Sequence, residues 1–362
     1  MATTVESIRK MVVAFKKGDA TAFRSAVQEY VEEERRRNHP VVARDIERIL
    51  ENGHRNGHAL TPLSVREATS ILGELPTDKE RGTPLVEIRE DERSLDELVL
   101  GDDTREAVDR LVQEHRRNEM LHAHGLHASG KVLFCGPPGC GKTVVAGAIA
   151  KALYVPLVLV RFDAVISSYL GDTAANLRKV FDFARARPMV LFFDEFDAIG
   201  KRRTDESDHG ELKRVVNSFL QMLDGFRGES LIIAATNHEQ ILDPALWRRF
   251  DEIVQFPRPQ PDQIETLLVR SLRQVGVAPS VLLKEQARKL SGMSFADIER
   301  IAMDAIKQVV LDGTKEIDRE TFEQAIARQR RRLALTGGHV EVRPGRTMAS
   351  RGARQHASPR RR

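Results

Sequence analysis

Residues 131–153 constrain the fold more than any other part of the chain, because they predict a strand, a glycine-rich turn and a helix in succession. Within them, residues 136–143 fit the pattern G-x-x-x-x-G-K-[ST] of a phosphate-binding loop. Gly136, Gly139 and Gly141 have no Cβ, so the turn can bring its N–H groups close to phosphate oxygens. The dipole of the following helix adds positive potential. A glycine turn without a nucleotide is the alternative, and the flanking strand and helix argue against it.

The chemistry of a nucleotide site needs a cation, a metal ligand and a base, and two motifs supply them. Lys142 is expected to reach the β- and γ-phosphates, and the Thr143 hydroxyl to be a Mg²⁺ ligand. Residues 189–198, MVLFFDEFDA, form an apolar strand that ends in two acids. Asp194 would hold Mg²⁺ through water, and Glu195 would orient and deprotonate the attacking water. A pair of capping acids at a strand end is the alternative. The predicted nucleotide contacts of the loop are Gly136, Pro137, Pro138, Gly139, Cys140, Gly141, Lys142, Thr143 and Val144.

The length and composition of the chain predict a folded protein of more than one domain. A chain of 362 residues is long for a single core, and 41% hydrophobic residues are enough for globular folding. No apolar run approaches the length of a membrane span, and the N-terminus has no sustained apolar stretch typical of a signal peptide. Cys135 and Cys140 are the two cysteines, which argues against a disulfide scaffold. We therefore expect a cytoplasmic protein without a membrane partner.

The positive charge is concentrated at the C-terminal end. The net charge is +4, but residues 337–362 hold seven Arg and one acid, Glu341, and contribute +6, so the remaining chain carries −2. Such a composition cannot bury a core, so residues 336–362 are expected to be a disordered Arg-rich tail. No recognised nucleic-acid-binding motif accompanies the tail, and we expect only non-specific attraction of nucleic acid to it.

The spacing of apolar residues divides the rest of the chain into four parts. Residues 1–60 contain three short amphipathic patterns, which predict a helical bundle that holds a partner or packs on the next domain. Residues 61–94 are rich in turn residues and predict a linker. Residues 95–257 alternate strands and helices, and residues 258–335 are helical again.

The strands of residues 95–257 are continuous apolar runs, which are typical of strands buried on both faces. They are predicted at residues 132–135, 157–160, 190–194, 231–236 and 252–256. The fold class is therefore α/β, with a parallel five-stranded sheet covered by helices on both faces and a separate helical subdomain after it.

Three histidines precede the first of these strands and invite a metal-site hypothesis. His122, His124 and His127 flank Gly125 at a predicted helix end. No cysteine and few carboxylates accompany them, so we expect no metal there.

The order of the motifs over residues 95–333 resembles that of the AAA family of ATPases. GPPGCGKT is followed by SSYLGDTAANLRKVFDFAR, VLFFDEFDAI, VVNSFLQMLDGF, IIAATN, DPALWRRFDEIVQF and GMSFADIERI. The resemblance implies a P-loop NTPase sheet, a C-terminal helical lid at residues 258–335, and ATP with Mg²⁺ as cofactors. The arrangement of a single AAA module after an N-terminal helical bundle is similar to that of compact bacterial-type AAA proteins.

The resemblance also implies roles for residues outside the two motifs. Asn237 looks like the sensor that positions the water or the γ-phosphate. Arg248 and Arg249 look like arginine fingers that reach the ATP of a neighbouring subunit, where a guanidinium spreads the transition-state charge. Leu98 and Val99 are the implied adenine contacts.

Two further segments resemble functional segments of the AAA family. Tyr169, Leu170 and Gly171 resemble the aromatic-hydrophobic-glycine loop that lines the pore of AAA rings and grips polypeptide. An ordinary half-buried aromatic is the alternative for the tyrosine. Residues 224–226, DGF, match the segment that signals between subunits.

Two positions depart from the family pattern. Arg248 and Arg249 are adjacent, whereas many members separate these arginines with Pro-Gly, and this form is closer to the spastin and katanin branch. Phe295 replaces the second glycine of the lid motif G-x-S-G-A-D. A bulky side chain beside the adenine or ribose can alter nucleotide affinity.

Motifs and resemblance together predict a Mg²⁺-dependent ATPase that forms a ring, expected to be a homo-hexamer. Its expected work is to remodel, unfold or translocate a protein client through a central pore. One alternative is an ATP-driven regulatory subunit that switches a separate protease or nuclease, since the sequence holds no H-E-x-x-H or G-x-S-x-G motif of its own. The other is a nucleic-acid motor, suggested by the Arg-rich tail alone.

Overall fold

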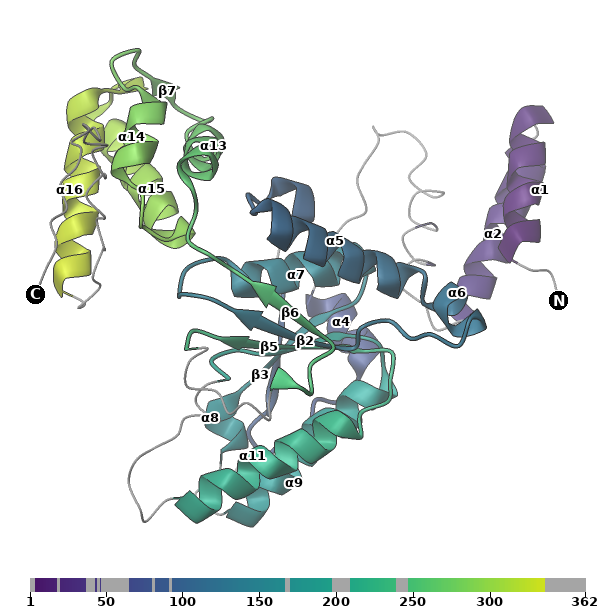
Figure 1. Cartoon of the computed structure of the whole chain (residues 1–362). Coiled ribbons are helices and arrows are strands. Elements are labelled where there is room, and N and C mark those ends of the chain that lie inside the picture. The colour runs from purple at the N-terminus through teal and green to yellow at the C-terminus, as the bar shows by residue number, and fades with distance from the viewer. Residues whose placement is uncertain are drawn as a thin grey trace, which may run out of the picture. The chain divides into compact units, whose positions relative to one another are not determined.

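The computed structural model of the chain is shown in Figure 1. It describes residues 4–17, 20–36, 43, 46, 65–79, 82–90, 93–166, 170–196, 209–238 and 247–335. The chain divides into two compact units. Met1–Pro259 with Ser294–Ala296 form the first unit, and Gln260–Met293 with Asp297–Arg362 form the second.

A six-stranded sheet, drawn in the middle of Figure 1, organises the first unit. Its strand order is β1-β3-β4-β5-β2-β6. Its strands are β1 (Val86–Arg89), β2 (Lys131–Cys135), β3 (Leu157–Val160), β4 (Val190–Phe193), β5 (Leu231–Thr236) and β6 (Glu252–Gln255). The five strands from β2 to β6 pair in parallel, which confirms the predicted α/β sheet. The sixth, β1, is an addition that the apolar runs did not predict, and it pairs antiparallel with β3.

Helices cover both faces of this sheet because successive strand residues alternate between two buried clusters. Leu133 and Cys135 of β2 face the helices α9 (Leu170–Ala186) and α11 (His209–Asp224). Val132 and Phe134 face the other side. The helices there are α5 (Asp102–Arg116) and α7 (Lys142–Leu153) (Figure 1). The shorter elements of this region are the 3₁₀ helix η1 (Leu95–Glu97), α6 (Asn118–Ala123) and α8 (Phe162–Val165).

Part of the stretch expected to be a linker is folded against the sheet. It contains α4 (Val65–Leu72), an antiparallel bridge between Thr77 and Pro84, and β1. The amide of Asn176 in α9 donates to the buried Asp78 carboxylate at 3.1 Å. The ammonium of Lys179 donates to the Thr77 carbonyl at 2.7 Å. These long-range bonds tie the stretch to α9, so this part differs from the expected linker.

The N-terminal region contains two packed helices, α1 (Thr4–Lys17) and α2 (Ala20–Arg36). Val27 and Val31 of α2 are buried against Met11 of α1. Ala43 and Ile46 join this cluster. The rest of the third predicted helix lies outside the described residues, as does the Arg-rich tail.

The second unit is helical, with a short two-stranded sheet. Its helices are α13 (Pro261–Ser271), α14 (Leu283–Lys289), α15 (Phe295–Asp312) and α16 (Arg319–Leu335), and its strands are β7 (Gly276–Val277) and β8 (Glu316–Ile317). Ile264, Leu268, Ile301 and Phe322 are fully buried, so each long helix contributes to the core. Among the helices described in either unit, none is long and apolar enough to cross a membrane.

Candidate nucleotide site

The phosphate loop follows β2 and is pressed against the end of β6. Gly136 has φ +144°, and a Cβ at this position would lie 2.3 Å from the Phe256 carbonyl oxygen. The Phe256 N–H in turn donates to the Cys135 carbonyl at 2.7 Å. Gly141, with φ +93°, is the N-cap of α7, so the helix dipole points its positive end into the loop. Backbone of this shape is a cradle that a side chain would fill, and it fits phosphate oxygens.

Lys142 is buried inside this loop, with 6% of its surface exposed. Its ammonium donates to the carbonyl oxygens of Gly136 at 2.7 Å and Pro137 at 3.0 Å. It also donates to the side-chain oxygen of Asn237 at 2.7 Å. The structure therefore brings the predicted sensor, at the end of β5, to the predicted phosphate-binding lysine. A phosphate oxygen carries the negative charge that these three neutral acceptors lack, so it can replace them as a partner of Lys142.

The predicted metal ligands also meet. The Thr143 hydroxyl donates to the Asp194 carboxylate at 3.1 Å, which joins the start of α7 to the end of β4. The other Asp194 oxygen accepts the Glu195 N–H at 2.9 Å. A hydroxyl beside a carboxylate is an all-oxygen donor set, which fits the hard cation Mg²⁺.

Glu195 follows Asp194 in a left-handed backbone conformation, with φ +50°. Residues other than glycine adopt this conformation rarely, and it recurs at functional positions. The next residue is fixed, because the Phe196 N–H donates to the Ala235 carbonyl at 2.8 Å and its ring is buried. The Glu195 side chain itself is exposed, so water can reach its carboxylate.

The two adjacent arginines have different surroundings. Arg249 forms an ion pair with Asp224, with 2.8 Å between the guanidinium Nε and the carboxylate. Arg248 is exposed and forms no ion pair with any other residue that the structure describes. Arg185 of α9 also contacts the DGF segment, since it donates to the Gly225 carbonyl at 3.3 Å. The arginine pair and the DGF segment are therefore neighbours.

Comparison with known proteins agrees with this geometry. The family model described as "ATPase family associated with various cellular activities (AAA)" matches residues 132–258. The chain is 39% identical over 329 residues to an uncharacterized AAA family ATPase, y4kL, of Sinorhizobium fredii strain NBRC 101917 / NGR234. This match covers 91% of the chain and 96% of the relative. The chain belongs to the AAA family of ATPases.

A second relative is named as an ATP-dependent zinc metalloprotease, FtsH 3 of Sphaerobacter thermophilus. It is 32% identical over 294 residues, a match that covers 78% of this chain and 60% of the relative. Family membership makes this chain an ATP-binding ATPase, and the geometry of Lys142, Thr143 and Asp194 agrees with that activity.

The other residues of this AAA ATPase that are predicted to contact the nucleotide differ in their burial. Leu98 is buried in the cluster that contains α5 and α7, while Val99 is half-buried. Phe295 packs against the same cluster, and the neighbouring Ala296 N–H donates to the Gly139 carbonyl at 3.0 Å. In the loop itself, Cys140 is buried, Pro137 and Val144 are half-buried, and Pro138 is exposed.

The predicted pore loop is only partly described. Tyr169 lies outside the described residues, and Leu170 and Gly171 are the first residues of α9. The structure therefore leaves the role of Tyr169 as a prediction.

A half-buried histidine that no sequence motif singled out is His115 of α5. Its Nε2 lies 3.0 Å from the Ser129 carbonyl oxygen, and burial lowers the pKa of its imidazole. His122 and His127 are exposed, with 3.4 Å between their ring nitrogens. Within the described parts of the chain, no group of three or more His, Cys, Asp or Glu side chains is placed to hold a metal ion.

Proposed function

We propose that this AAA ATPase hydrolyses ATP with Mg²⁺ in a cytoplasmic ring of identical subunits, expected to be a hexamer, and moves a protein client through the pore. The observation that carries the proposal is the meeting of Lys142 and Asn237 beside the Thr143–Asp194 pair. Four side chains, two at the start of α7 and two directly after β4 and β5, converge at the carboxyl edge of the sheet, where α/β folds bind ligands.

Each residue of the site has a distinct task. The Lys142 ammonium and the N–H groups of the phosphate loop bind phosphate oxygens. Thr143 and Asp194 would hold Mg²⁺, which neutralises charge on the transferred phosphoryl group when bound. The Glu195 carboxylate accepts a proton from the attacking water. Asn237 donates from its amide to orient that water or the γ-phosphate.

The arginine pair supports the ring in this proposal. Arg248 is exposed, and the described structure offers it no carboxylate partner. A guanidinium placed in this way can reach the phosphates of a neighbouring subunit, where it stabilises charge that develops in the transition state. Hydrolysis then depends on assembly, and the DGF segment, which contacts Arg249 through Asp224, carries the state of one subunit to the next.

The client is a protein in this proposal. The Tyr169 loop would grip polypeptide in the pore and move with the nucleotide state, because α9 begins directly after it. A Tyr169→Ala variant is then expected to hydrolyse ATP at the wild-type rate and to fail in unfolding a client. Normal client unfolding by this variant would remove the pore-loop role.

A second candidate is a regulatory ATPase that switches a separate protease. The relative named as an ATP-dependent zinc metalloprotease supports it, since 60% of that protein aligns with this chain. Residues 1–362 hold no H-E-x-x-H motif, so in this candidate the protease site lies outside these residues.

The mass of a Glu195→Gln variant in solution tests the proposed ring. This change removes the base and keeps the phosphate contacts, so ATP is expected to stay bound and the variant to form particles of about six chains with ATP and Mg²⁺. Multi-angle light scattering with and without nucleotide measures the mass of the particles. A matched Lys142→Ala variant, which loses the phosphate contact, is expected to show no such change. A Glu195→Gln particle that stays monomeric with ATP would contradict the ring and the role of Arg248.

A further inference from the structure

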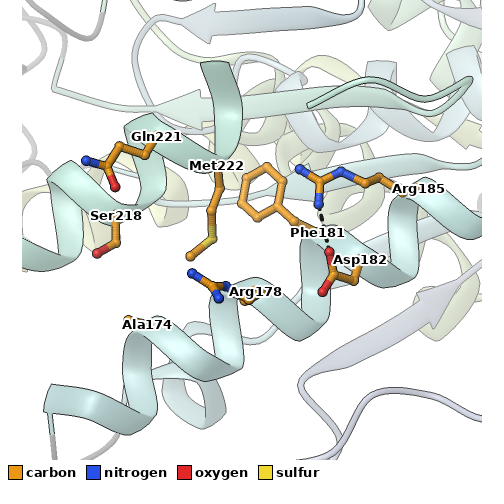
Figure 2. A pocket seen from close by; sticks show the side chains of 8 residues that line it. All are labelled: Ala174, Arg178, Phe181, Asp182, Arg185, Ser218, Gln221 and Met222. Carbon is orange, nitrogen blue, oxygen red and sulfur yellow. Dashed lines mark hydrogen bonds and ion pairs between the residues drawn. The ribbon is translucent and has the colours of Figure 1, made fainter. Parts of the chain in front are cut away.

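A groove lies between α9 and α11, apart from the nucleotide site (Figure 2). Its volume is about 420 Å³. Residues of α9 and α11 line it, among them Arg178, Phe181, Arg185, Gln221 and Met222. None of these residues belongs to the phosphate loop or to the acids of β4. A volume of this size takes one or two side chains of a peptide and is too small for a folded domain.

The floor of the groove is apolar. Phe181 is fully buried and packs against Phe193 and Phe219 of the core, with ring centroids 5.8 and 5.6 Å away. Met222 is half-buried, and Figure 2 shows its thioether directed into the space between the two helices. Methionine adapts its shape to different apolar partners, which is useful in a peptide-binding surface.

The rim of the groove is positively charged and incompletely paired. The Asp182 carboxylate is already held by Arg185, at 2.7 Å. Arg178 is exposed and has no ion-pair partner among the described residues. Figure 2 shows the Arg178 guanidinium beside Met222, in the gap between α9 and α11. A guanidinium binds a carboxylate through two parallel hydrogen bonds, so a carboxylate is the group that would complete this rim.

We propose that the groove docks an acidic peptide segment of a partner protein. An Asp or Glu of the peptide pairs with Arg178, and an adjacent apolar side chain packs on the half-buried Met222, above the buried Phe181 ring. The apolar floor favours a peptide over a nucleic acid, whose backbone presents repeated phosphates to basic side chains. Ser218 and Gln221 on α11 supply polar groups for the peptide backbone.

Phage-displayed random dodecapeptides panned on the full chain test this without knowledge of the partner. Panning without nucleotide keeps the test independent of ATP hydrolysis and of ring assembly. We expect enriched peptides to contain Asp or Glu next to an apolar residue. Synthetic, fluorescein-labelled copies are expected to bind Arg178→Glu about tenfold more weakly than the wild type, since a charge-assisted pair becomes a repulsion.

Two control variants distinguish peptide binding in this groove from binding elsewhere on the chain. Arg117→Glu makes the same charge change at an exposed position between α5 and α6, so it is expected to bind the peptides like the wild type. Met222→Ala is expected to weaken binding by removing part of the floor. No enrichment, or enriched peptides that bind Arg178→Glu as tightly as the wild type, would overturn the proposal. So would a single-stranded oligonucleotide that displaces the peptides and whose own binding is lost in Arg178→Glu.

Discussion

The close approach of Gly136 to Phe256 allows a stability prediction with a built-in control. In Gly136→Ala the new Cβ would meet the Phe256 carbonyl oxygen at 2.3 Å and its carbon at 2.9 Å, distances that force the backbone to move. The Phe256 backbone is held by its bond to Cys135, and its ring lies 4.7 Å from that of Phe134. In Gly141→Ala the φ is also positive, +93°, but nothing lies within 4 Å of the new Cβ.

The two variants differ in one free-energy term. Both suffer the strain of an L-residue at positive φ, about 1–2 kcal/mol. Gly136→Ala adds overpacking against the backbone, about 1–3 kcal/mol. The free energy of unfolding should therefore fall by roughly 2–5 kcal/mol in Gly136→Ala and by about 1–2 kcal/mol in Gly141→Ala. At about 2–4 °C per kcal/mol for a domain of this size, the melting temperatures of the two variants should differ by roughly 2–12 °C.

Differential scanning calorimetry of the full chain measures both changes on the transition of the first unit. A loss of nucleotide affinity in Gly136→Ala, measured by titration with a fluorescent ATP analogue, is expected to accompany its lower melting temperature. Equal melting temperatures for the two variants would refute the close approach of the loop to β6. Wild-type melting temperatures in both would refute the left-handed backbone as well.

Three further predictions concern ionisable side chains. Arg248→Ala is expected to lower kcat for ATP by about 10³-fold or more in a steady-state assay without lowering the melting temperature, and near-normal turnover would contradict its role in a neighbouring site. Arg249→Ala loses an exposed ion pair with Asp224, so we expect a stability change of about 0–1 kcal/mol and a smaller loss of kcat than in Arg248→Ala; the reverse ranking would reassign the two arginines. Burial lowers the pKa of the His115 imidazole, so as the pH falls the unfolded chain binds a proton at this residue before the folded chain does. The resulting contribution to the free energy of unfolding is present above about pH 6.5 and is lost as the pH falls below it. A His115→Gln variant should show a shallower fall in melting temperature between pH 7.5 and 5.5, and an unchanged slope would exclude this histidine as its cause.

The buried parts of the fold could be predicted from sequence, because burial on both faces leaves a strong apolar signal. The runs that became β2 to β5 are apolar at almost every position. The short β1, VEIR, alternates apolar and charged residues and follows a turn-rich stretch, so its pattern is weak. Its pairing with β3 depends on residues more than 60 positions away, which no local pattern records.

The candidate site, too, could be predicted from the sequence only in part. Its motifs indicated Lys142, Thr143 and Asp194 as candidates, because phosphate and Mg²⁺ binding need fixed residue types at fixed spacing. The pairing of Arg249 with Asp224 and the burial of His115 arise from tertiary contacts. The three neighbouring histidines drew attention by their spacing in the sequence, whereas His115, whose pKa is lowered by burial, stands apart from them.

The edge strand β1 has a practical consequence for work on shorter forms of the chain. Since β1 is the outer neighbour of β3, a chain that starts at residue 95 or later leaves the apolar LVLV edge of β3 unpaired. Exposed edges of this kind pair with other copies, while the charged Glu87 and Arg89 of β1 oppose such pairing. Self-association of a truncated catalytic core would therefore report strand-to-strand adhesion, and only a chain that retains β1 can give a meaningful subunit count.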